Sequence, residues 1–265
     1  MDNTLILNFG DSQGEVYDYI FYYNTNYIKY TNINSPGWRS GWSLRGLNKT
    51  KYHDILFKPL YDLSSNIENV FIFLTFGSVD IEWNLSYKRF ILKENPDTYT
   101  FIDEMINSFK NIIDKYILLE KNLQKIKNIN FHIIITFPFI PLPLSESYMK
   151  NFSNNNNTIF YDVISHHERF YLWYIYCNKL ISIIKSYNFK RLYIIDIRND
   201  FIKKGFQHFM NLKNEDHHPN FLITKEYIIT QLNNLTFYDN QNRIINLENL
   251  SWNNNFLYSH IRRPL

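Results

Sequence analysis

Short apolar runs alternate with longer amphipathic stretches along most of this 265-residue chain. Consecutive apolar residues are typical of a strand that is covered on both faces of a sheet. They predict strands at residues 5–9, 27–30, 70–76, 131–137 and 192–196. Apolar positions three and four residues apart predict amphipathic helices instead. These helices are expected at about residues 15–22, 101–127, 163–187 and 224–232.

Strands that alternate with helices in this way predict an α/β fold. The expected architecture is a three-layer sandwich, in which a central, mostly parallel sheet is flanked by helices. From about Phe237 onward the pattern fades into Asn-rich sequence. We therefore expect a domain over residues 1–236. Residues 237–265 are expected to form a C-terminal extension, or a linker to a further domain.

Composition narrows the class of protein. Hydrophobic residues make up 45% of the chain and charged residues 20%, which excludes disorder, collagen and a coiled coil. A single Cys excludes a disulfide framework and a Cys-based zinc site. The net charge of +3 comes without a dense basic patch, so no nucleic-acid partner is expected. No apolar run is long enough for a bilayer and the N-terminus resembles no signal peptide, so we expect a cytoplasmic protein without a membrane partner.

Polar residues with catalytic potential lie at the ends of three of the predicted elements. In open parallel sheets, ligands bind beyond the carboxyl ends of the strands. Gly10-Asp11-Ser12 follows the first strand, and Gly77-Ser78-Val79-Asp80 follows the strand at residues 70–76. The third segment, Glu215-Asp216-His217-His218-Pro219-Asn220, precedes the last predicted helix. A serine hydroxyl is a poor nucleophile until a base takes its proton, and His218 is a candidate for that base.

Each of these segments also has a structural interpretation. Asp11 and Ser12 are common turn and N-cap residues, and Asp80 is equally able to cap a helix. The two histidines with Glu215 and Asp216 could hold a metal ion. Adjacent histidines point apart, however, and no third His or Cys ligand is evident, so no metal is expected.

The three segments, together with Ser35-Pro36-Gly37, resemble the sequence blocks of the SGNH (GDSL-type) hydrolase superfamily. Asn8-Phe9-Gly10-Asp11-Ser12 is similar to the first block, which carries the nucleophilic serine. Ser35-Pro36-Gly37 is similar to the second block, and Phe76-Gly77-Ser78-Val79-Asp80 stands where the third block belongs. Glu215-x-x-His218-Pro219-Asn220 resembles the last block. The resemblance implies a flavodoxin-like sheet and a site for acyl transfer.

The resemblance also implies roles for individual residues. Ser12 would be the nucleophile and His218 its base, oriented by Glu215 or Asp216. Sequence leaves both acids open, although the spacing of the block favours Glu215.

The set of hydrogen-bond donors expected for the oxyanion is less complete in this sequence than in the superfamily blocks. Gly37 would supply an N–H donor, with Gly41 as the alternative. Val79 stands where the superfamily has an Asn donor, and losing such a donor costs about 10²–10³ in rate. Ser78, or another donor, could compensate. Asp80 would line the site, and Asp11 would fix the turn before Ser12.

Two residues in loops expected near the site are candidate substrate contacts. Arg39 could bind a phosphate of coenzyme A or of a nucleotide sugar, and Trp83 could stack on a sugar. Arg39 could equally be a solvated charge. Aromatic residues make up 18% of the chain, which dilutes the signal from Trp83.

The constellation predicts an acyl-transfer enzyme but not its acceptor. The main hypothesis is an acetyltransferase that moves acetyl from acetyl-CoA to an amino or hydroxyl group of a sugar or nucleotide sugar in glycan biosynthesis. It is motivated by the altered oxyanion block and by the form F-G-x-x-D, which resembles a glycan-associated branch of the superfamily. One alternative is an esterase or deacetylase acting on an acylated carbohydrate. Another is a carbohydrate-binding module without catalysis, which the Val79 departure favours.

Overall fold

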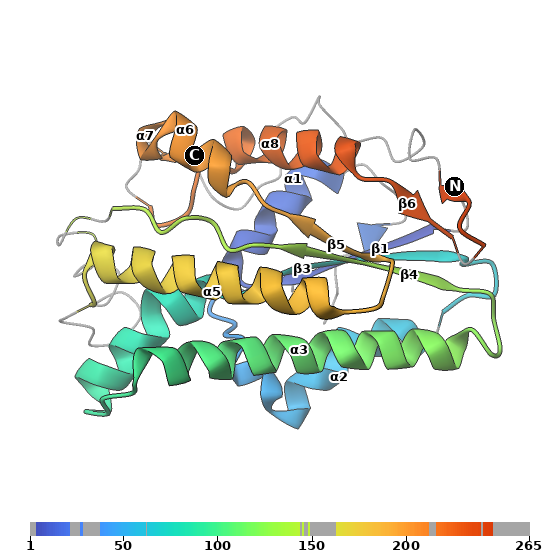
Figure 1. The fold of residues 1–265 in the computed structure, drawn as a ribbon, viewed down its shortest axis with the longest axis horizontal. Coiled ribbons are helices and arrows are strands. Elements are labelled where there is room, and N and C mark those ends of the chain that lie inside the picture. The colour runs from blue at the N-terminus through green and yellow to red at the C-terminus, as the bar shows by residue number, and fades with distance from the viewer. Residues whose placement is uncertain are drawn as a thin grey trace.

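A five-stranded parallel sheet forms the centre of the computed structural model (Figure 1). The structure describes residues 4–21, 27–28, 38–61, 63–143, 145, 148, 163–211, 216–239 and 241–245. The strands in sheet order are β2 (Tyr27–Ile28), β1 (Thr4–Gly10), β3 (Asn69–Thr75), β4 (Asn130–Thr136) and β5 (Leu192–Ile195). Every pair of neighbours is parallel. The predicted α/β class is confirmed.

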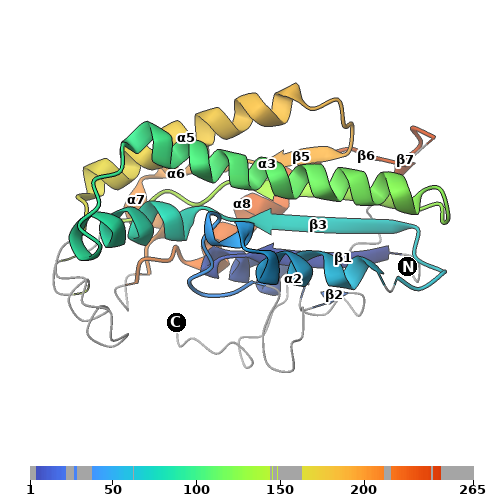
Figure 2. The same ribbon diagram turned by 90° about the horizontal axis from the view of Figure 1, so that it is seen from below.

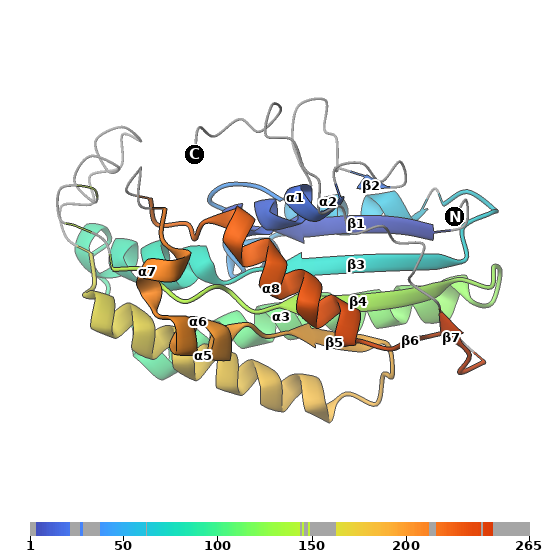
Figure 3. The same cartoon turned by 90° about the horizontal axis from the view of Figure 1, so that it is seen from above.

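Helices cover both faces of this sheet. They are α1 (Asp18–Phe21), α2 (Thr50–Tyr61), α3 (Thr98–Leu123), α5 (His166–Ser186), α6 (Arg198–Lys204), α7 (Phe206–Phe209) and α8 (Phe221–Asn234). Figure 2 shows α2, α3 and α5 on one face, and Figure 3 shows α1 and α8 on the other. The three predicted layers are therefore present. No described helix is long and apolar enough to cross a membrane.

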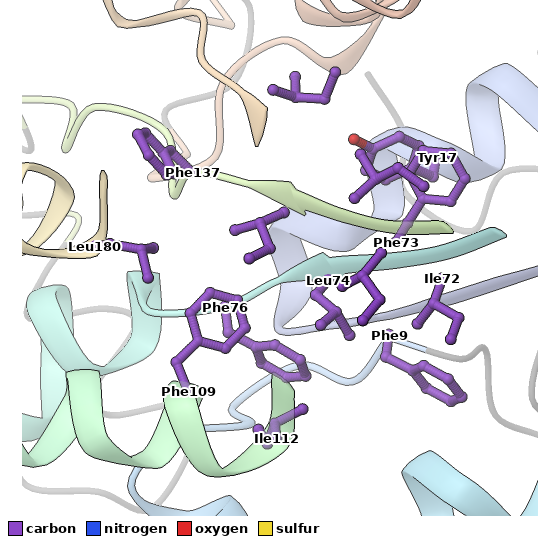
Figure 4. Close-up of a cluster of buried hydrophobic side chains, with 14 of the residues drawn as sticks. Phe9, Tyr17, Ile72, Phe73, Leu74, Phe76, Phe109, Ile112, Phe137 and Leu180 are labelled. Atoms are coloured by element: carbon purple, nitrogen blue, oxygen red, sulfur yellow. The ribbon is translucent and has the colours of Figure 1, made fainter. Parts of the chain in front are cut away.

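Side chains of the central strand pack into both helical layers (Figure 4). Phe73 contacts the ring of Tyr17 at 4.6 Å between centroids. Beyond the strand end, Phe76 contacts Phe109 of α3 at 6.4 Å. All four rings are buried. Burial of one such side chain contributes about 1.5–3 kcal/mol, which explains why strands in this position have no polar face.

The structure differs from the predicted elements in three places. Helices α2, α6 and α7 were not among the predicted ones. Two π-helical segments, Asp80–Asn84 and Tyr87–Ile91, replace the loop expected to hold Trp83. A small antiparallel pair, β6 (Phe237–Tyr238) and β7 (Ile244–Ile245), lies beyond the predicted domain boundary. Phe237 is buried against Phe71, so the chain still contacts the core there, and the boundary at 236 stays a prediction.

The strand order places the ends of β1 and β3 side by side. Chain connections leave β1 and β3 toward opposite edges of the sheet, and in open parallel sheets ligands bind beyond the carboxyl ends of the strands at such a point. The backbone N–H of Asp11 donates to the carbonyl of Thr75 at 2.9 Å. A Cβ on Gly10 would lie only 2.5 Å from that same carbonyl oxygen, so glycine is required for this approach. Described residues of all three candidate segments meet at these strand ends.

Candidate active site

Ser12 begins a 3-10 helix (Ser12–Tyr17) that leaves the end of β1. Asp11 is its N-cap, and Asp11 Oδ1 accepts the backbone N–H of Gln13 at 3.0 Å. This cap fixes the turn because it satisfies a donor that has no partner inside the helix. The side chain of Ser12 is buried, with 3% of the residue exposed.

His218 reaches Ser12 from the loop that precedes α8. The side chain of Asn220 caps α8 by accepting the N–H of Leu222 at 3.1 Å. At the start of that helix the ring of Phe221 contacts Tyr19 of α1 at 5.8 Å. Packing of α8 on α1 therefore sets the position of His218, two residues ahead of its cap.

Three predicted residues form one hydrogen-bonded chain. His218 Nε2 lies 2.6 Å from Ser12 Oγ. His218 Nδ1 lies 2.6 Å from Asp216 Oδ1, which also accepts the backbone N–H of His218 at 3.0 Å. Glu215, the acid that the spacing favours, lies outside the described residues. The structure thus pairs Asp216 with the imidazole; the catalytic roles of the three residues stay predictions.

The surroundings of Asp216 favour its charged form. Burial by itself would raise the pKa of Asp216, but the hydrogen bond from His218 and the charges of His218 and His217 hold the pKa well below its usual range. An ionised carboxylate at Nδ1 keeps the proton on that nitrogen and leaves Nε2 as an acceptor. His218 is thereby set up to take a proton from Ser12.

The turn after β3 ties its polar groups to neighbouring loops. The N–H of Ser78 donates to Asp11 Oδ2 at 3.0 Å, and its hydroxyl also hydrogen-bonds to Asp11. Asp80 Oδ2 accepts the N–H of Leu44 at 2.6 Å, and its Oδ1 accepts from Asn84 at 3.0 Å. These contacts give Asp11 and Asp80 bracing positions in the site wall. The N–H and hydroxyl of Ser78 already serve Asp11, which does not favour Ser78 as the substitute oxyanion donor.

The candidate backbone donors for an oxyanion are the N–H groups of Ser12 and of the loop with Gly37 and Gly41. The N–H of Ser12 stands at the first helical position, where no partner inside the helix exists. Gly37 lies outside the described residues. Gly41 is exposed with a φ of +80°, and a Cβ added to it would have no atom within 4 Å, which is typical of an open turn. The N–H of Arg39 is taken by the carbonyl of Gly10 at 3.0 Å.

The two candidate substrate contacts differ in their surroundings. Arg39 runs beside Gly10, its guanidinium lies 5.0 Å from the ring centre of Trp42, and its buried Nε has no partner among the described residues. Trp83 lies in the π-helical segment Asp80–Asn84 and is only 8% exposed. Its ring meets His217 edge-on at 5.4 Å. Trp83 is thus part of the site wall rather than of an open loop.

Two residues near the site were not predicted from the sequence. Glu82 is buried, and burial raises its pKa to about 8 although the charge of Arg169 acts in the opposite direction. Tyr148 places its hydroxyl 2.6 Å from His217 Nδ1. Glu82 is buried by tertiary packing, for which the sequence carries no local signal. Tyr148 is 69 residues from His217 and has no local signal.

The same loop holds a group of possible metal ligands. Asp216, His217 and His218 each offer one ligand atom, and these atoms lie within 4.8 Å of one another. Asp216 Oδ1 and His218 Nδ1 are hydrogen-bonded to each other, and His217 Nδ1 to Tyr148. A metal ion would have to replace these bonds. The arrangement therefore favours proton transfer, and the expectation of no metal stays a prediction.

Two solved structures align with most of this chain. One, assigned provisionally as a platelet activating factor from Streptococcus pneumonia, is 13% identical with a TM-score of 0.44, over 88% of this chain and 82% of that one. The other, a carbohydrate esterase family 3 protein from Talaromyces cellulolyticus, is 12% identical with a TM-score of 0.44, over 88% and 94%. No protein-family model matches this chain, and no curated protein does. What this site does must follow from its own geometry and chemistry.

Proposed function

We propose that this protein is an acyl-handling enzyme in which Ser12 is the nucleophile. The observation that carries the proposal is the continuous chain from Ser12 Oγ through His218 to Asp216, with both separations at 2.6 Å. Such a chain activates a hydroxyl that is otherwise unreactive at neutral pH. Its place at the carboxyl end of β1 is where ligands of open parallel sheets bind.

Each residue has a defined task in this mechanism. His218 Nε2 takes the proton of Ser12 as its oxygen attacks the acyl carbon, and later returns that proton to the leaving group. Asp216 fixes the tautomer of His218 and stabilises the imidazolium that forms. The N–H of Ser12 is placed to donate to the developing oxyanion. His218 then deprotonates the acceptor as it attacks the acyl carbon, and that proton returns to Ser12 Oγ as the bond between Oγ and the acyl carbon breaks.

Hydrolysis of an acylated carbohydrate is the first candidate reaction. Water needs no binding site beyond space beside His218, so the chain of three residues suffices for an esterase or deacetylase. Trp83 and Trp42 are both buried in the surroundings of the site, at 8% and 9% exposure, so recognition of the sugar is left to the polar groups.

Acetyl transfer to a sugar or nucleotide sugar is the second candidate reaction, with acetyl-CoA as the donor. The positive charge of Arg39 beside the end of β1 favours it because coenzyme A and nucleotide sugars carry phosphates. Val79 favours it too, since an amine acceptor attacks well even where the oxyanion site is weak. A carbohydrate-binding module without catalysis is the third candidate, and the intact chain of three residues argues against it.

A paired assay separates these candidates. The purified protein is offered p-nitrophenyl acetate and acetylated sugars in one set, and acetyl-CoA with amino sugars and nucleotide sugars in the other. We expect acetate release that is lost in Ser12→Ala and His218→Ala but kept in the exposed control Ser64→Ala. Thiol release that requires a sugar would establish the transferase instead. Sugar binding with no turnover in either set would overturn the enzyme proposal.

A further inference from the structure

A second imidazole, that of His217, lies directly against the one assigned to catalysis. The ring centres of His217 and His218 are 3.8 Å apart. Trp83 closes one side of His217 edge-on, and His217 is 7% exposed. The ring of His217 therefore has little room to turn away from the loop, and its protonation pattern matters to its neighbours.

Two groups compete for the Nδ1 atom of His217. The hydroxyl of Tyr148 lies 2.6 Å away, and Asp216 Oδ1 lies 3.3 Å away. A tyrosine hydroxyl both donates and accepts, whereas a carboxylate only accepts. The backbone N–H of His217 also points to the Tyr148 oxygen, at 3.4 Å. This oxygen therefore accepts from the backbone and has its own proton to give to Nδ1.

The choice of partner at Nδ1 affects the proposed catalytic pair. Asp216 Oδ1 already receives the N–H and Nδ1 of His218. A proton on His217 Nδ1 would be donated to this same oxygen. That would weaken the bond that orients His218, because one carboxylate oxygen would then serve three donors.

We propose that Tyr148 is a positioning residue whose hydroxyl keeps the proton of His217 on Nε2, so that Asp216 serves His218 alone. This inference rests on the proposed function of the site. Tyr148 acts through His217, because its hydroxyl contacts Nδ1 and the backbone N–H of that residue. Its loss would leave the fold intact but let His217 compete with His218 for Asp216.

A double-mutant cycle tests this arrangement. Tyr148→Phe removes the hydroxyl, and we expect kcat for ester hydrolysis to fall about tenfold with KM unchanged, as for one lost hydrogen bond. His217→Gln removes the competing Nδ1 while keeping an amide N–H near the Nε2 position. In that background, Tyr148→Phe should have no further effect on kcat. Equal losses in both backgrounds would overturn the proposal.

A second readout does not depend on any substrate. The ¹⁵N shifts of histidine side chains distinguish which ring nitrogen carries the proton. His217 should be protonated on Nε2 in the wild type and on Nδ1 in Tyr148→Phe, and thermal unfolding of both proteins checks that the fold is kept. An unchanged tautomer in a folded Tyr148→Phe would refute the role of Tyr148. The expected change in tautomer, in a protein with no esterase or transferase activity, would uphold the inference and refute the proposed function.

Discussion

Asp216 and Glu82 lie in two neighbouring regions that shift the pKa of a carboxyl group in opposite directions. In the loop before α8, hydrogen bonds and positive charges hold the pKa of Asp216 below its usual range, against the effect of burial. In the π-helical segment after β3, burial prevails and raises the pKa of Glu82 to about 8. Withdrawal from water alone therefore does not decide protonation. The balance between burial and stabilising contacts decides it: the side chain of Asp216 keeps 33% of its surface exposed beside two histidines, whereas Glu82 is 3% exposed.

The largest expected effect comes from removing the charge in that loop. Asp216→Asn keeps the shape but no longer fixes the tautomer of His218, so kcat should fall by about 10³–10⁴. Ester hydrolysis under saturating substrate measures this. Glu215→Gln is the matched control and should change kcat by less than about threefold. The reverse ranking of the two variants would assign the orienting role to Glu215.

The second largest effect is the change in unfolding free energy when Glu82 is replaced. A folded-state pKa of about 8, above the ordinary 4.5, means that the contribution of Glu82 to stability is full below about pH 4.5 and is lost as pH rises through about 8. Glu82→Gln cannot ionise and should unfold at a higher temperature than wild type at pH 9, by a few kcal/mol in free energy. The two should be alike at pH 4.

Thermal unfolding at both pH values measures this difference. The exposed Glu226→Gln serves as a control that should show no such pH-dependent gain. A Glu82→Gln protein that unfolds earlier than wild type at pH 9 would mean that the ionised form is stabilised, for example by Arg169.

The third effect tests the contact between the turn after β1 and the turn after β3. Asp11 accepts the N–H of Gln13 in one turn and that of Ser78 in the other. Asp11→Asn leaves one of these donors facing an amide NH₂, at a cost of about 1–3 kcal/mol in unfolding free energy, and shifts Ser12 enough to lower kcat. Asp97→Asn, at the cap of α3, should alter neither quantity much, because Asn caps helices about as well as Asp. Full activity in Asp11→Asn would separate the two turns functionally.

The smallest expected effect comes from adding a hydrogen-bond donor for the oxyanion to the turn after β3. Val79→Asn puts an amide where the resemblance places one, and we expect kcat to rise about tenfold, less than a preorganised donor would give. Val79→Ala, which adds no donor, should not raise kcat. No gain from the Asn variant would show that position 79 does not face the developing charge.

Strands were predictable from this sequence because the central strands carry apolar residues on both faces. The run at residues 70–76 predicts a buried strand, and the bounds of β3 agree with it to within one residue. The π-helical segments were not predictable in the same way. Their hydrogen bonds span five residues, so side chains on one face do not recur at intervals of three and four. Helix α2 contains Pro59, which usually indicates a break in a helix.

The sequence predicted the nucleophile and base candidates of the site, but not the hydrogen bonds that hold the surrounding loops in place. Ser12 and His218 were found because each follows or precedes a clear element with its turn residues. The pairing of Asp216 with His218 depends on backbone geometry in a loop, which a spacing rule does not capture. The contacts of Ser78, His217 and Tyr148 join segments far apart in the chain, and no local pattern marks them.

Ser12 and His218 are 206 residues apart in the chain, and α8 docks His218 onto the first helical turn. During synthesis, a nascent chain that has not yet released residue 220 carries a Ser12 hydroxyl with no base, which is a poor nucleophile. Reactivity of Ser12 would then appear only when α8 docks. A serine-directed probe applied to growing chains of defined length would therefore report the chain length at which α8 docks.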